Sequence, residues 1–280
     1  MFQLLKKKFA KIYRGSYHYE NFPVAPFYFS KKKIKALKVI YKFARYSDDI
    51  ADSTRFSKLV KLNELIRIKK CLYKEAKPKN SFEKKIFDNL FFEIKHWNLS
   101  LINFSCLVDA FISDQQKSEY ENMDEILTYC KNSANPVGRI VLELFNENNE
   151  KNIPLSDSVC SGLQILNFVQ DIENDLKIGR FYMPKDILKK HDCEFITLTT
   201  KSLKNEKFIR EIISICERYL EQGFKLKNKL KGSLRIYMKF ITIASLRCCE
   251  KLKQNGNFFK KNRKLTFYDY SVILYRVILT

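Results

Sequence analysis

The chain contains few of the residues that interrupt regular backbone structure. Its 280 residues include only 7 Gly and 6 Pro. Sandwiches and barrels need a turn about every 8–12 residues, so this scarcity disfavours a turn-dense all-β fold as well as collagen-like and Gly/Pro-rich chains. Hydrophobic residues make up 45% of the sequence, which predicts a folded chain with a sizeable core.

The cysteine and histidine residues do not form a recognisable metal motif. The chain has 8 Cys and 3 His, and no two cysteines are spaced C-x-x-C. A structural zinc site needs clustered ligands at short spacing, and a disulfide scaffold needs a higher cysteine density. We therefore expect free thiols, a reducing cytosol and no zinc.

Long apolar runs are also missing. A spanning helix needs about 18–20 apolar residues, and the best candidates, Phe240–Leu246 and Val272–Leu279, are short. The basic N-terminal residues are not followed by the apolar stretch of a signal peptide. The sequence predicts a cytoplasmic protein that makes at most peripheral contact with an acidic membrane, at its inner face.

Positive charge is abundant, with 52 Lys and Arg against 31 Asp and Glu, a net charge of +21. Such a charge favours anionic partners, which include nucleic acids, acidic lipids and phosphorylated small molecules. A generally lysine-rich composition explains the excess equally well. The basic residues are scattered and match no helix-turn-helix, zinc-finger or RNP pattern, so no nucleic-acid partner is expected.

Apolar residues recur at spacings of three and four along most of the chain, which is the period of amphipathic helices. We expect one all-α domain over residues 1–280, with eight to ten helices. The segments with this pattern are Lys33–Asp52, Phe82–Asn98, Leu101–Gln116, Met123–Ser133, Val137–Asn146, Asp157–Leu176, Lys207–Lys229 and Leu234–Asn255.

Several residues predict where these helices end. Pro136 lacks a backbone donor and should interrupt the helical pattern around it. The polar segment Asn146–Pro154 is expected to be a loop, with Ser156 or Asp157 as the next N-cap. Gly179 is placed as a C-terminal stop.

A polar stripe runs along the segment GLQILNFVQDIENDLKIGRFYMP at 162–184. Gln164, Asn167, Asp171 and Asp175 are spaced i, i+3, i+7 and i+11, which places them on one helix face. The other faces are apolar. Burying a polar group without a partner costs roughly 1–3 kcal/mol, so this stripe should face a polar cavity or bound cations.

A second stripe lies in YKFARYSDDIADS at 41–53. Tyr41, Arg45, Asp48 and Asp52 are spaced i, i+4, i+7 and i+11. Asp49 is turned off this face by about 100°, and its side chain can still reach the edge of the stripe. Both helices therefore carry an Asp-x-x-x-Asp pair on a polar face.

Two such pairs would repel each other if they faced one another, and hard cations relieve that repulsion. A single D-D-x-x-D is common at an exposed helix end, whereas two matching pairs on otherwise apolar helices are hard to explain as solvated faces. Mg²⁺ prefers carboxylate oxygens and is commonly shared with substrate phosphates. The pattern suits ionisation of an allylic diphosphate in a dry cavity, to which the 23 Phe and 15 Tyr could contribute. A large hydrophobic core would require a similar number of aromatic residues, so their abundance does not by itself indicate such a cavity.

At these residues the sequence resembles a known family. YKFARYSDDIADS and NFVQDIENDLKIGRFYMP resemble the two Asp-rich motifs of trans-isoprenyl diphosphate synthases of the squalene/phytoene synthase type. ENFPVAPFYFS at 20–30 and YCKNSANPVGRIVLELF at 129–145 are similar to the bacterial hydroxysqualene synthase branch, which serves hopanoid biosynthesis. The resemblance extends from about His18 to Arg276.

This resemblance implies an isoprenoid synthase fold, a single helical bundle around a central cavity. It implies that Mg²⁺, as more than one ion, is held by the five motif aspartates: Asp48, Asp49, Asp52, Asp171 and Asp175. The same comparison gives roles to further residues. Those expected to contact substrate or line the cavity are His18, Tyr41, Arg45, Tyr129, Gln164, Asn167 and Arg180, with Tyr129 counted among the catalytic residues.

The branch implies conversion of presqualene diphosphate to hydroxysqualene and diphosphate, without a nicotinamide cofactor. Glu20 and Gln170 stand where condensing members of the family tend to have basic residues, which weakens a second diphosphate site. Pro26 stands where the branch often shows Ser. Two alternatives stay open: a condensing squalene, dehydrosqualene or phytoene synthase acting on farnesyl or geranylgeranyl diphosphate, and a non-catalytic relative that acts as a binding or assembly factor.

Overall fold

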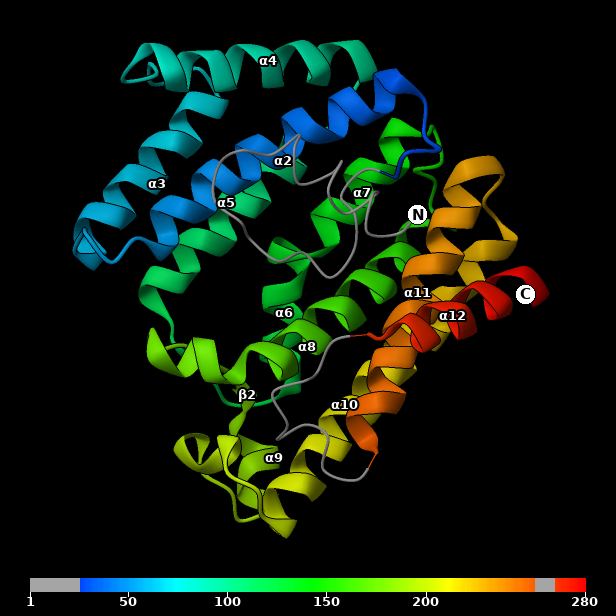
Figure 1. The fold of residues 1–280 in the computed structure, drawn as a ribbon. Helices are drawn as coiled ribbons and strands as arrows, with labels where there is room; N and C mark the ends of the chain where they lie inside the picture. Colours follow the sequence, from blue (N-terminus) through cyan, green and yellow to red (C-terminus); the bar gives the residue numbers. More distant parts are fainter. Residues whose placement is uncertain (1–25, 255–264) are drawn as a thin grey trace.

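The structure is a computed structural model, which describes residues 26–254 and 265–280. Helices dominate it, and they cross one another in a single layered bundle (Figure 1). The α-helices are α2 (Lys31–Asp52), α3 (Lys58–Leu72), α4 (Ser81–Trp97), α5 (Leu101–Gln116), α6 (Met123–Ser133), α7 (Asn135–Leu144), α8 (Ile153–Lys177), α9 (Lys185–Lys190), α10 (Leu203–Phe224), α11 (Gly232–Lys253) and α12 (Phe267–Leu279). The predicted all-α class is confirmed.

Apart from a small core between α11 and α12, two large apolar cores hold the helices together. One lies among α2, α3, α4 and α5, and the second is formed by α6, α8, α10 and α11. Trp97 packs against both cores and so joins them. In Figure 1, α2 to α5 occupy the upper left of the molecule, α8 crosses its middle toward the lower left, and α10 and α11 lie below and to the right of α8. The Asp-rich ends of α2 and α8 belong to different halves of the bundle.

Helices α8 and α10 pack against each other at a glycine. A Cβ atom on Gly223 would lie 2.7 Å from the Leu155 carbonyl oxygen, closer than real Cβ contacts allow. The missing side chain therefore permits the close approach that fixes α8, the helix that carries the second polar stripe.

A short parallel strand pair fixes the end of α8 beside the end of α5. Strand β1 (Glu119–Tyr120) follows α5 and pairs with β2 (Phe181–Pro184), which follows α8. Gly179, at a φ of +72°, turns the chain between α8 and β2. This left-handed conformation is easy for glycine, as expected for the predicted stop.

The predicted helix limits are mostly right. Pro136 does separate α6 from α7, but α7 already begins at Asn135, since proline is tolerated in the first turn. The predicted loop Asn146–Pro154 is right for residues 146–152, and only its last two residues belong to a helix, for the same reason. Helix α8 starts at Ile153 with Asn152 as its N-cap, and Ser156 and Asp157 lie inside the helix.

Three further differences concern the ends and number of helices. The predicted helix to Lys229 ends at Phe224, and a 3₁₀ helix, η2 (Lys225–Asn228), follows it. The lysine-rich α3 and the short α9 were not predicted. Helix α12 was not predicted either.

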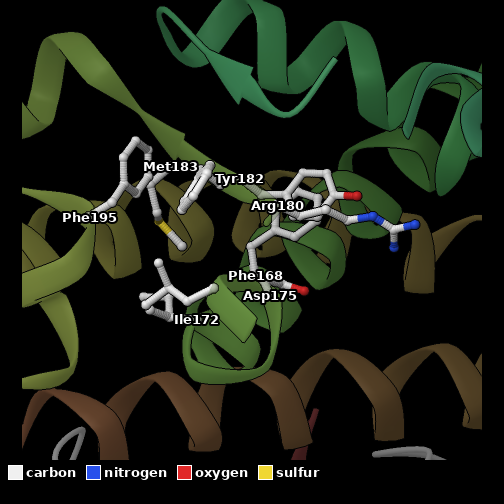
Figure 2. A pocket seen from close by; sticks show the side chains of 9 residues that line it. Phe168, Ile172, Asp175, Arg180, Tyr182, Met183 and Phe195 are labelled. Atoms are coloured by element: carbon white, nitrogen blue, oxygen red, sulfur yellow. The ribbon is translucent and has the colours of Figure 1, made fainter. Parts of the chain in front are cut away.

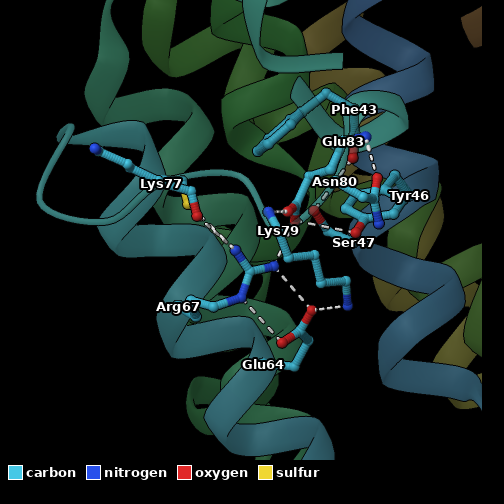
Figure 3. A network of polar contacts seen from close by, with 10 residues as sticks. Phe43, Tyr46, Ser47, Glu64, Arg67, Lys77, Lys79, Asn80 and Glu83 are labelled. Carbon is cyan, nitrogen blue, oxygen red and sulfur yellow. Dashed lines mark hydrogen bonds and ion pairs between the residues drawn. The ribbon is translucent and has the colours of Figure 1, made fainter. Parts of the chain in front are cut away.

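A buried polar network joins α2, α3 and α4 (Figure 3). Glu83 is fully buried and accepts hydrogen bonds from Arg67 Nη2 (2.5 Å), Tyr46 OH (3.0 Å) and the Lys79 backbone N–H (2.6 Å). Arg67 also donates to Glu64 (2.8 Å), and Lys79 pairs with the same carboxylate. Because Tyr46 lies two residues before Asp48, the network holds the turn of α2 that begins the first motif.

None of the helices in the described ranges has both the length and the apolar character required to cross a membrane. All eight cysteines are free in the structure.

Candidate active site

The first Asp-rich motif lies in the last two turns of α2. Arg45 Nη1 is 2.6 Å from Asp48 Oδ2, and Arg45 Nη2 is 2.6 Å from Asp49 Oδ1. Asp48 is partly buried and close to Asp52. Burial, followed by the charge of Asp52, raises the pKa of Asp48 to about 7, even though Arg45 acts in the opposite direction. The positive charge of Arg45 is therefore too weak to offset the effects of burial and of Asp52 on the Asp48 carboxylate.

The second motif reaches the first through Arg180. After α8 ends, the turn at Gly179 directs the Arg180 side chain back to α2, where Nη1 lies 2.7 Å from Asp52 Oδ1. These residues are 128 positions apart in the sequence. Asp175 is half-buried, and its pKa is raised to about 7 by burial and by Asp171, with Asp52 contributing in the same direction. The structure thus brings the two acidic motifs together around one arginine.

Three side chains converge on the C-terminal end of α2. The Ala51 carbonyl oxygen accepts hydrogen bonds from Lys61 Nζ (3.1 Å), Gln115 Nε2 (3.3 Å) and Arg180 Nη2 (3.4 Å). Cations suit this place because the helix end carries partial negative charge. Lys61 and Gln115 were not among the predicted site residues, and no motif in the sequence pointed to them.

A buried carboxylate forms the floor behind the motifs. Asp114, on α5, accepts hydrogen bonds from Tyr182 OH (2.7 Å) and Tyr129 OH (3.0 Å). Burial is the main reason that its pKa is raised to about 6, while the nearby Arg180 lowers it. Sequence reasoning missed Asp114 and Tyr182. A sequence signal for Asp114 was present, because this carboxylate lies near the end of a mostly apolar helix, Leu101–Gln116.

An aromatic pocket adjoins these groups (Figure 2). Phe168 and Tyr182 stack face to face, with ring centres 4.3 Å apart and planes 8° apart. The pocket is small and partly open to solvent, and Asp175 and Arg180 form part of its lining. In Figure 2 the Arg180 guanidinium points away from the apolar end, which Met183 and Phe195 form. The site thus has a charged side and an apolar aromatic side.

The remaining predicted residues lie further along the two stripes. Tyr41 and Gln164 are half-buried, whereas Asn167 and Asp171 are exposed. The part of the second stripe formed by Asn167 and Asp171 therefore lies on the solvent-exposed side of α8. His18 lies outside the described residues, as does Glu20.

The donor set fits Mg²⁺ only together with a second ligand. Within residues 26–254 and 265–280, no three acidic, Cys or His side chains meet closely enough to form a metal site by themselves. Mg²⁺, however, is usually held by one or two carboxylates plus substrate phosphates, so the Asp52 and Asp175 carboxylates, which interact electrostatically, suit an ion that is shared with a diphosphate. The raised pKa values of Asp48 and Asp175 agree with a place that a cation would stabilise.

A family model for squalene/phytoene synthase matches residues 16–269. The chain belongs to this family. It is 31% identical over 218 residues to a hydroxysqualene synthase of Sinorhizobium fredii, with 76% of this chain and 72% of that protein covered. It is 33% identical over 172 residues to a hydroxysqualene synthase of Zymomonas mobilis, with 61% of this chain and 56% of that protein covered.

Among solved structures, the chain is similar to the squalene synthase HpnC from Alicyclobacillus acidocaldarius. The two chains are 26% identical and superpose with a TM-score of 0.74, covering 85% of this chain and 90% of the other. The match to the Zymomonas mobilis protein spans little more than half of that relative's length. The isoprenoid synthase fold and the family are therefore established.

Proposed function

We propose that this squalene/phytoene synthase family member converts presqualene diphosphate to hydroxysqualene and inorganic diphosphate in a Mg²⁺-dependent reaction. The observation that carries the proposal is the Arg180–Asp52 contact, which joins two acidic motifs beside an aromatic pocket. The similarity to two hydroxysqualene synthases supports this substrate within the family.

Arg45 and Arg180 would bind the diphosphate. Each now pairs with motif carboxylates, and each can exchange such a partner for phosphate oxygens, since the guanidinium fork of donors binds both carboxylates and phosphates. Asp48, Asp49, Asp52, Asp171 and Asp175 would hold Mg²⁺. The bound metal supplies neutralisation of the charge that grows on the leaving diphosphate.

The aromatic side would stabilise the carbocation that remains after the carbon–oxygen bond to diphosphate breaks. Phe168 and Tyr182 line the pocket and stack on each other, so they would form an apolar wall that keeps water away from the cation. One water molecule then adds to the rearranged cation and loses a proton. The Tyr182 hydroxyl can pass this proton to Asp114, whose pKa of about 6 leaves it largely ionised at neutral pH.

A condensing synthase is the second candidate, because the similar solved structure bears the name squalene synthase. Gln170, which precedes Asp171, is uncharged where condensing members tend to carry arginine, so it offers no positive charge to a second diphosphate. A non-catalytic relative is less well supported, since all five motif aspartates are present.

Product analysis after separate incubation with presqualene, farnesyl and geranylgeranyl diphosphate, with and without Mg²⁺, tests the proposal. We expect hydroxysqualene from presqualene diphosphate only, and only with Mg²⁺. If the enzyme consumed farnesyl or geranylgeranyl diphosphate and left presqualene diphosphate unchanged, it would instead be a condensing synthase.

The metal role is tested by Asp48→Asn and Asp171→Asn. Both variants should keep the helical circular-dichroism spectrum and lose at least 100-fold in kcat/KM, because each removes a carboxylate charge. Glu173→Gln is the matched control, since Glu173 is exposed on the same turn of α8 and pairs with Lys177. Unchanged turnover in either aspartate variant would contradict metal binding by these motifs.

A further inference from the structure

Helix α12 has an apolar inner side that the fold explains. Ile273 is fully buried and, together with Tyr270 and Val277, packs against Ile243 and Ala244 of α11. An amphipathic helix at a protein surface would present polar residues on its other side.

The outer side of α12 is also apolar. Phe267, Leu274, Tyr275 and Ile278 are 79%, 46%, 64% and 81% exposed. They are spaced i, i+7, i+8 and i+11, so they follow one face of the helix, with only Ser271 as a polar member of that strip. Single exposed apolar residues are common, but a continuous strip along a whole helix marks an interaction surface.

Both charged side chains of α12 are used in the fold. Asp269 is buried, caps the helix through Thr266, and pairs with Arg247 and Lys251. Arg276 pairs with Glu250 of α11 at 2.6 Å. The outward strip consequently carries no charge of its own.

A strongly basic segment precedes α12 in the chain and lies beside it in the fold. Residues 225–239 contain six Lys and Arg residues and no Asp or Glu. Four of them, Lys225, Lys229, Lys231 and Arg235, are exposed. Within the part of the chain that the structure describes, none of the six forms an ion pair with a carboxylate, in contrast to most arginines elsewhere.

Two contacts place this basic segment at the C-terminal end of α12. Lys239 Nζ lies 3.4 Å from the Val277 carbonyl oxygen. Lys227 Nζ stands 4.1 Å above the ring of Phe224, which belongs to the same small core as Val277 and Ile273. The uncharged strip and the unpaired cations therefore adjoin each other.

We propose that the outer face of α12 docks onto an anionic lipid bilayer, with its apolar side chains in the headgroup–acyl boundary and the residues of segment 225–239 on the acidic headgroups. An apolar helix face flanked by Lys and Arg is the chemistry of an interfacial helix, and each basic residue near an anionic leaflet adds to the attraction. A second copy of the chain is a poorer occupant. A two-fold contact between α12 helices would bring two basic segments together.

Co-sedimentation of the full-length chain with vesicles, in the absence of substrate, tests this proposal independently of any catalytic activity. We expect binding to vesicles with 30–40% phosphatidylglycerol, at roughly tenfold or higher affinity than to pure phosphatidylcholine, and weakening of that binding with salt. The double variant L274S/I278S should lower the affinity for anionic vesicles at least tenfold. R235Q/K231Q should lower it severalfold and reduce the salt dependence.

The matched control is L59S/I102S, which removes two similarly exposed apolar side chains from α3 and α5. It should bind vesicles as the unmodified chain does, and circular dichroism checks that every variant keeps its helical content. Equal vesicle binding by L274S/I278S and the unmodified chain would overturn the proposal. So would no vesicle binding together with a dimer in sedimentation velocity that L274S/I278S converts to monomer, because α12 would then join two copies.

Discussion

Two aspartates of the site, Asp48 and Asp175, lie in surroundings that disfavour the charged form of their carboxyl groups. Asp175 is half-buried beside Asp171, and its pKa of about 7 compares with 3.8 for an unperturbed aspartate. The folded state therefore binds this proton more tightly than the unfolded state does. Between about pH 4 and pH 7 its contribution to the free energy of unfolding decreases as pH rises. Such a residue is retained at a cost to stability, as is common for functional groups.

Replacing Asp175 with Asn should accordingly stabilise the metal-free protein. At pH 8 we expect the free energy of unfolding to rise by about 1 kcal/mol, with little change at pH 4, because the neutral amide removes a buried like charge. Urea unfolding at the two pH values measures this. E173Q should change neither value by more than about 0.5 kcal/mol, as expected for an exposed surface pair. If Asp175→Asn lowered the free energy of unfolding at pH 8, and lowered it more there than at pH 4, the proposed effect of the buried charge would be contradicted.

At the scale of elements, the polar network at Glu83 fixes how α2, α3 and α4 meet. Hydrogen bonds from Arg67 lower the pKa of Glu64 to about 2. Burial acts to raise the pKa of Glu83, but the hydrogen bonds from Arg67 and Lys79 outweigh it and lower the pKa. Both carboxylates therefore stabilise the fold fully above about pH 4.5 and lose that effect as pH falls toward 2.

We expect Glu83→Gln to lower the free energy of unfolding at pH 7 by about 2 kcal/mol, because it weakens charge-assisted hydrogen bonds to a buried acceptor. The loss should shrink at pH 3, where protonation already weakens the network. Urea unfolding followed by circular dichroism provides the measurement. Asp88→Asn, on the exposed side of the same helix, is the control and should leave stability within about 0.5 kcal/mol.

Across the whole molecule, the site is completed by residues from both halves of the bundle. Asp52 comes from α2, Asp114 from α5, and Asp175 and Arg180 from α8 and the turn after it. A ligand that contacts all of them should hold the two halves together. Ligands that bind only the folded state stabilise it by mass action.

Mg²⁺ and inorganic diphosphate should therefore raise the Tm together by about 5 °C at concentrations near 100 times Kd, and much less when added singly. Differential scanning fluorimetry measures the shift, and EDTA should reverse it. Asp48→Asn should lose the joint shift, whereas the exposed Asp88→Asn should keep it. An equal shift with diphosphate alone would mean that the basic surface binds the anion without a metal.

Much of the fold could be predicted from local sequence. Apolar spacing indicated most helices, and Pro136 and Gly179 marked real interruptions, because the backbone chemistry of proline and glycine acts over only a few residues. Helix α12 and the start of α8 were not predicted correctly. At Pro154, a proline of the kind that usually ends helices instead occupies the first turn of α8.

The sequence by itself determined the helical class, the family and the two aspartate stripes, since each depends on residue type at short spacing. Only the tertiary structure decided which groups meet: Arg180 on Asp52, Tyr182 and Tyr129 on Asp114, and Lys61 with Gln115 on the Ala51 carbonyl. Those contacts join residues up to 128 positions apart. They arise from how helices pack around shared cores, which no local pattern of side chains specifies.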